Sequence, residues 1–69
     1  MYKAEKFVKS VFPTAKAHAI YDDTSFIIDG FPEGSGMRKW DTWHKTERKA
    51  WNEAARQIHR KMLKQLENA

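Results

Sequence analysis

The chain has 69 residues, no cysteine and a formal net charge of +4, so it forms one domain at most and has no thiol for a disulfide or a metal site. Aromatic residues make up 13% of the chain, too large a share for a disordered polar segment, and no apolar run is long enough for a signal peptide or a membrane span. The composition predicts a small folded cytoplasmic domain with no cofactor and no membrane association.

The first expected element is a short helix that ends near Phe12. Apolar residues recur at positions 4, 7, 8, 11 and 12, a spacing that places them on one helix face. Pro13 cannot continue this helix and disfavours the helical conformation of the residue before it. The helix should therefore stop at or just before Phe12, with Phe7, Val8, Val11 and Phe12 in the core.

Two strands are expected next, over residues 15–21 and 25–29, with Asp22-Asp23-Thr24 as the turn of a hairpin. Alternation leaves apolar side chains on both faces of the second strand. On the first strand, one face has small side chains that would let a helix pack closely. The residues that share this face are Ala15, Ala17, Ala19 and Tyr21.

The stretch 30–36 contains all three glycines and is predicted to be a loop that divides the chain into two parts of one domain. Residues 1–36, the first helix, hairpin and loop, carry four lysines against five acids. Residues 37–69 carry nine basic residues against four acids. The basic part fits an anionic partner, either nucleic acid or an acidic protein face, and fits a solvated Lys/Arg helix equally well.

Residues 37–45 are compatible with a short strand, a helical turn or an ordered loop, and this choice stays open. Thr46 is a plausible N-cap for a second helix over residues 47–67, and Trp51 on its apolar face is expected in the core. The predicted fold is therefore α+β: a short N-terminal helix, a two-stranded antiparallel β-hairpin and a long C-terminal helix, in the order α-β-β-α.

The second helix should be longer than the elements on which it packs. At 1.5 Å per residue it spans about 30 Å, against about 15 to 20 Å for the first helix or a strand. Met62, Leu63 and Leu66 should then extend past the hairpin and support a weak homodimer. Docking of another protein, edge-to-edge pairing of the hairpin and a solvated last turn remain the alternatives.

The sequence offers little for catalysis. The three histidines, His18, His44 and His59, have no spacing that would place two of them on one helix face to hold a metal. Asp22 and Asp23 suit a turn better than an acid–base pair, and no serine lies in a nucleophile motif. We therefore expect a protein that is not an enzyme.

The candidate partner-binding residues are aromatic and basic. Exposed tryptophan and arginine are enriched at binding hot spots, and tryptophan among cations also suits stacking on bases. Whether Trp40 and Trp43 lie in the core or on the surface stays open. The predicted residues are Arg38, Lys39, Trp40, Trp43, Lys49, Arg56, Arg60 and Lys64.

Three segments of the sequence, taken together, carry a resemblance to known proteins. They are Phe12-Pro13-Thr14-Ala15, Ser25-Phe26-Ile27-Ile28, and Thr46 followed by Ala50-Trp51-Asn52-Glu53-Ala54-Ala55. The layout resembles small uncharacterised proteins of tailed phages and prophages, and the resemblance extends over approximately residues 6–58. It implies a phage or prophage origin and a role in binding and modulating a host protein, for example as an inhibitor. Nucleic-acid binding by the basic helix is the alternative function.

Overall fold

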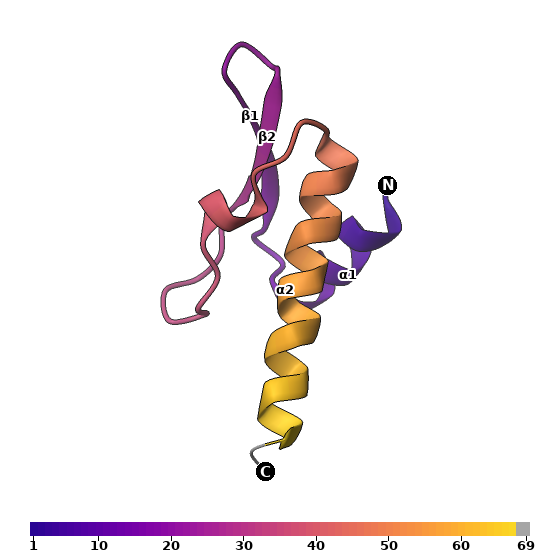
Figure 1. Ribbon diagram of the computed structural model, residues 1–69, viewed down its shortest axis with the longest axis vertical. Helices are drawn as coiled ribbons and strands as arrows, with labels where there is room; N and C mark the ends of the chain where they lie inside the picture. The colour runs from indigo at the N-terminus through magenta and orange to yellow at the C-terminus, as the bar shows by residue number, and fades with distance from the viewer. Residues whose placement is uncertain (68–69) are drawn as a thin grey trace.

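The computed structural model describes residues 1–67 and confirms the predicted α+β fold in the order α-β-β-α. Figure 1 shows the long helix α2 beside the hairpin, with α1 crossing α2. The elements are α1 (Lys3–Val11), β1 (Lys16–Ile20), β2 (Ser25–Asp29), the 3-10 turn η1 (Lys39–Thr42) and α2 (Glu47–Glu67). Among the described residues, no helix combines the length and the apolar character needed to cross a membrane.

The hairpin has a four-residue turn, one residue longer than predicted. β1 and β2 are antiparallel, and the last pair in the register is Ile20 with Ser25. Tyr21 was expected in the first strand, and this prediction is wrong because its φ of 52° is left-handed and cannot continue a pleated strand. Asp22 and Asp23 are also left-handed, with φ of 53° and 65°, and aspartate tolerates that conformation.

A single residue of the open segment 37–45 pairs with β2 on the side opposite β1. The backbone N–H of Phe26 donates to the carbonyl oxygen of His44 at 2.7 Å, and the N–H of His44 donates back to the carbonyl oxygen of Phe26 at 2.9 Å. At Phe26, β2 is therefore the inner strand. The segment 37–45 is neither a strand nor a free loop, but a 3-10 turn followed by one bridge.

The core lies where α2 meets α1, β2 and the segment before β1. Trp51 is buried as expected, and both Ile27 and Ile28 are buried, which confirms apolar burial on both faces of β2. Of the four residues expected in the core at the N-terminal end, Val8 is fully buried, and Phe7, Val11 and Phe12 are partly buried and pack against the core. The buried cluster comprises Val8, Ala15, Ile28, Ala50, Trp51, Ala54 and Ile58.

The elements overhang one another at both ends of the molecule, which measures 43 × 23 × 18 Å. Figure 1 shows the hairpin turn projecting past the start of α2, and the last turns of α2 projecting past α1. Ala19, expected to face a helix, is instead exposed because it lies near the projecting end of the hairpin. Ala17, nearer the middle, does pack against the core.

Candidate functional site

The segment that carries two of the three tryptophans is fixed firmly to the sheet. Thr42, at the end of η1, is fully buried, and its Oγ1 accepts a hydrogen bond from the backbone N–H of Ile28 at 2.7 Å. The same hydroxyl donates to the carbonyl oxygen of Lys39 at 2.5 Å, which closes the 3-10 turn. With the bridge from His44 to Phe26, these bonds join the segment 39–44 to β2 at two residues, Thr42 and His44.

Trp40 and Trp43 are both on the surface, which answers the question that the sequence left open. Trp40 is 55% exposed and Trp43 is 42% exposed. Trp40 lies within η1, and Trp43 directly follows Thr42, which is bonded to the sheet. The ammonium group of Lys39 lies 5.7 Å from the centre of the Trp40 ring, in cation–π range. We call Lys39, Trp40 and Trp43 the tryptophan platform.

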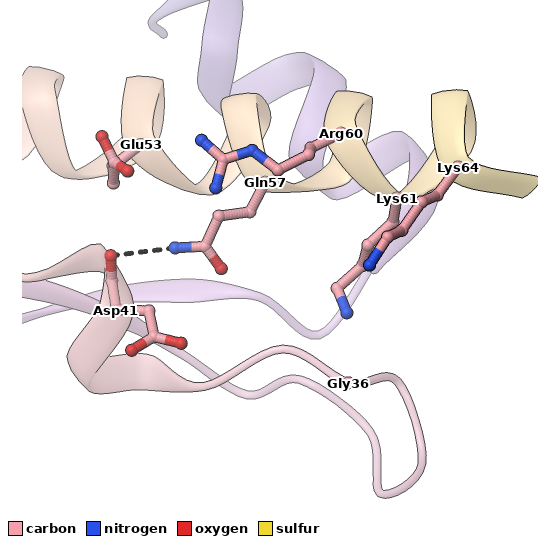
Figure 2. A pocket seen from close by; sticks show the side chains of 7 residues that line it. All are labelled: Gly36, Asp41, Glu53, Gln57, Arg60, Lys61 and Lys64. Atoms are coloured by element: carbon pink, nitrogen blue, oxygen red, sulfur yellow. Dashed lines mark hydrogen bonds between the residues drawn. The ribbon is translucent and has the colours of Figure 1, made fainter.

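A groove opens between η1, the loop before it and one side of α2 (Figure 2), and we call it the polar groove. The side-chain amide of Gln57 donates to the carbonyl oxygen of Asp41 at 2.9 Å and so joins the two walls. The groove has a volume of about 450 Å³. Its lining residues are Gly36, Asp41, Glu53, Gln57, Arg60, Lys61 and Lys64.

A glycine lies at one end of the polar groove. Figure 2 shows the Lys61 side chain reaching from α2 toward the loop that contains Gly36. A Cβ atom added at Gly36 would lie 2.5 Å from the Nζ atom of Lys61, and the φ of Gly36 is 75°. The positive φ favours glycine at this position, whereas the flexible end of the Lys61 side chain could move away from an added Cβ.

The polar groove carries both signs of charge. Arg60, Lys61 and Lys64 line it together with Asp41 and Glu53, and the Oε2 atom of Glu53 lies 3.6 Å from the guanidinium of Arg56. None of the lining residues is buried, so these charges stay solvated and interact weakly with one another.

All eight predicted partner-binding residues are exposed, but the structure gathers only some of them. Arg38 immediately precedes η1, and Lys39, Trp40 and Trp43 form the platform. Arg60 and Lys64 line the opposite wall of the polar groove. The two remaining residues, Lys49 and Arg56, are on α2 but do not line the groove.

Sequence reasoning missed five of the seven groove residues: Gly36, Asp41, Glu53, Gln57 and Lys61. Gln57 and Lys61 follow Glu53 at four-residue intervals, so one polar row on the helix was visible in the sequence. Nothing in the sequence indicates that this row faces η1, because that depends on the Gln57–Asp41 contact.

Two ion pairs lie outside the groove among the described residues. The ammonium of Lys9 donates to Oε2 of Glu5 at 2.8 Å, and this hydrogen bond lowers the pKa of the Glu5 carboxyl below its ordinary value. His18 Nε2 and Asp29 Oδ2 are 4.0 Å apart, and both side chains are solvent-exposed. Across residues 1–67, no three His, Cys, Asp or Glu side chains cluster as they would to hold a metal ion.

The three residues predicted to mediate self-association are exposed at the projecting end of α2. The exposed fractions are 43% for Met62, 60% for Leu63 and 73% for Leu66. They lie on the last turns of α2, whereas the tryptophan platform lies on η1 and the residue that follows it.

Comparison with protein-family models, with curated protein sequences and with solved structures found no match to this chain. The phage resemblance therefore stays a prediction. The geometry of the platform and the groove is the basis for a functional assignment.

Proposed function

We propose that this protein is a non-catalytic binding protein whose tryptophan platform and polar groove contact the surface of another protein. One observation carries the proposal: Trp40 and Trp43 are 55% and 42% exposed on a segment that Thr42 and His44 bond to the sheet. Tryptophan contributes more to interface energy than most residues, and rings on a preordered segment lose little entropy on binding.

A binding role also agrees with the character of the polar groove. Its lining side chains are solvated, so Asp41 and Glu53 lack the water-excluded surroundings that activate a catalytic carboxyl. The same side chains can form hydrogen bonds and ion pairs around a partner that is seated on the two tryptophans, in the polar rim that is usual for protein interfaces.

The phage resemblance supports a narrower proposal about the partner. We propose, on that resemblance alone, that the protein acts in the cytoplasm of a bacterial host and binds a host protein in order to modulate it. The basic balance of residues 37–69, with nine basic residues against four acids, favours an acidic face on that partner.

Nucleic-acid binding is the second candidate function, and the exposure of every predicted cationic residue favours it. Lys39 beside the Trp40 ring would also suit a stacked base. Asp41 and Glu53 in the groove would repel a phosphate backbone, however, and Glu53 interrupts the basic row of α2. Protein binding is for this reason placed first.

The test is a pull-down from bacterial lysate, treated with nuclease, using the wild type and the double variant Trp40→Ser/Trp43→Ser. We expect a specific protein to be retained by the wild type and lost by the double variant, with little change in the thermal unfolding of the variant. Tyr21→Ser is the matched control because it removes an aromatic ring that is 65% exposed on the remote hairpin turn.

The proposal would be contradicted if the wild type and the double variant retain the same proteins, or if neither retains a specific protein. A titration with duplex DNA at about 50 mM salt separates the second function. If nucleic acid is the partner, log affinity falls linearly with log salt, with a slope of about −0.9 for each phosphate neutralised.

A further inference from the structure

The two edges of the hairpin differ in what covers them. On the β2 side, Phe26 exchanges two backbone hydrogen bonds with His44, and the N–H of Ile28 donates to Thr42. On the β1 side, the backbone of the strand forms no hydrogen bond with any segment of residues 1–67 other than β2. Among the described helices and strands, only β2 and α2 contact β1. The outer edge of β1 is therefore free.

The free backbone groups on this edge belong to Ala17 and Ala19. Along an antiparallel strand, successive residues point their N–H and carbonyl groups alternately toward the paired strand and away from it. Phe26 and Ile28 point theirs away from β1, toward the η1 segment. Their partners across the ladder are Ala19 and Ala17, which therefore point theirs away from β2. The edge offers two donors and two acceptors to a further strand.

Two copies of this edge match each other in an antiparallel register centred on His18. Ala17 of each copy then lies opposite Ala19 of the other. Each of these pairs exchanges two hydrogen bonds, which satisfies all the free backbone groups of both residues in both chains. The small alanine side chains leave the two backbones room to approach. The product is one continuous sheet of four strands, with the two β1 strands at its centre.

The charges of the hairpin favour the same arrangement. Lys16 is at the start of β1, whereas Asp22 and Asp23 are in the turn beyond its other end, and all three are exposed. Antiparallel pairing brings the start of one β1 beside the turn of the other, so each lysine lies near two carboxylates of the other copy. The two His18 side chains meet at the centre, and Nε2 of each lies 4.0 Å from Oδ2 of Asp29 in its own chain.

We infer that the free edge of β1 pairs with the same edge of a second copy and forms a two-fold homodimer with a continuous four-stranded sheet. The inference is independent of the proposed function, because η1 and the tryptophan platform lie on the other side of β2. A five-residue strand buries less than the roughly 1,200 Å² of a stable specific interface, so the dimer is weak and reversible.

Disulfide trapping detects a dimer of this kind even when it is weak. The chain has no cysteine, so each variant carries a single thiol. In the inferred register the two copies of residue 18 have Cα atoms about 4.5 Å apart, within the range of a disulfide. Lys16→Cys and Ile20→Cys are the matched controls on the same face of β1, because each thiol would be about 13 Å along the strand from its copy.

We expect His18→Cys to form a disulfide-linked dimer at least about tenfold faster than either control under mild oxidation, measured by non-reducing electrophoresis. Ala19→Pro removes one outward N–H that makes no bond to β2, and proline is tolerated at such positions of an edge strand. Added to His18→Cys, it should abolish the tenfold preference, and thermal unfolding of the reduced protein verifies that the chain still folds.

The ionic part of the register is tested without altering the strand. Asp22→Asn/Asp23→Asn keeps residues that tolerate the left-handed turn, and it should slow the His18→Cys disulfide by about threefold or more. Asp41→Asn/Glu53→Gln, in the polar groove, is the matched control because it changes the net charge equally, and it should leave the rate unchanged.

Equal disulfide rates at positions 16, 18 and 20 overturn the inference, as does a preference at position 18 that a folded Ala19→Pro variant retains. Equal slowing by the two acid-removing variants also overturns it, since net charge and not the register would then set the rate. A dimer in sedimentation that Leu63→Ser/Leu66→Ser abolishes, without a preferred disulfide at position 18, assigns self-association to the end of α2 instead.

Discussion

The hydroxyl oxygen of Thr42 lies 2.7 Å from the backbone nitrogen of Ile28 and accepts its hydrogen bond, so one buried side chain joins the tryptophan platform to the inner strand. Thr42→Val keeps the shape of this side chain but leaves the buried N–H of Ile28 without an acceptor. We expect the free energy of unfolding to fall by about 1 to 3 kcal/mol, measured by urea denaturation.

Thr24→Val is the control for this prediction. The Thr24 hydroxyl donates to the carbonyl oxygen of Tyr21 at 2.6 Å in the exposed hairpin turn, where water can replace the bond. Its loss should cost clearly less than the loss of the Thr42 hydroxyl. Equal costs would mean that the platform does not depend on Thr42.

Gly30 is required for two physical reasons, its positive φ and its close approach to Thr14. Gly34 has only the first of these, so comparing the two glycines separates them. Its φ is 85°, and an added Cβ would lie closer to the carbonyl oxygen of Thr14 than any real contact allows. Gly34 has a similar φ of 80° and no atom within 4 Å of an added Cβ. Gly34→Ala should therefore cost about 1 to 2 kcal/mol from backbone strain alone, and Gly30→Ala distinctly more, in thermal unfolding. Similar costs at both positions would exclude the contact with Thr14 as a cause.

The three tryptophans should differ in fluorescence as they differ in burial. Trp51 is 1% exposed, and its Nε1 atom has no hydrogen-bond partner among the described residues. Trp51→Phe leaves only the exposed rings, so emission should shift to the red and iodide quenching should increase. The double variant Trp40→Phe/Trp43→Phe should show the opposite changes, and its stability should stay within about 0.5 kcal/mol of the wild type. Strong iodide quenching of Trp51 in the double variant would contradict the packing of α2 on the core.

Glu5 should contribute a small, pH-dependent stabilisation. The hydrogen bond from Lys9 lowers the pKa of Glu5 below its ordinary value of 4.5, so the contribution is present above that pH and is lost as the pH falls through the lowered pKa. Glu5→Gln should cost about 0.5 kcal/mol or less at neutral pH, because the pair lies at the surface of α1. The stability difference between wild type and variant should vanish in acid, and a difference that grows in acid would show that Glu5 acts in another way.

Local rules in the sequence were enough to predict the main elements. Pro13 marks the end of α1, which stops at Val11. The hydroxyl of Thr46 accepts a hydrogen bond from the backbone N–H of Lys49 at 3.2 Å, so the predicted N-cap is confirmed. Trp51 is buried as its helical spacing predicted. Each of these features depends on residues within one turn of helix or on one periodic face, which a sequence states directly.

The candidate site was decided by contacts between distant parts of the chain. Apolar residues do not recur at a regular interval in residues 39–44, so the sequence did not decide whether Trp40 and Trp43 lie in the core or on the surface. In the structure Thr42 takes the buried position, because its hydroxyl satisfies the N–H of Ile28, which a tryptophan ring without an acceptor cannot do. The two tryptophans consequently face solvent, and Asp41 meets Gln57 across the polar groove. The sequence by itself determined the helices, the hairpin and the core position of Trp51, whereas the pairing of the η1 segment with β2 and α2 determined which side chains a partner can reach.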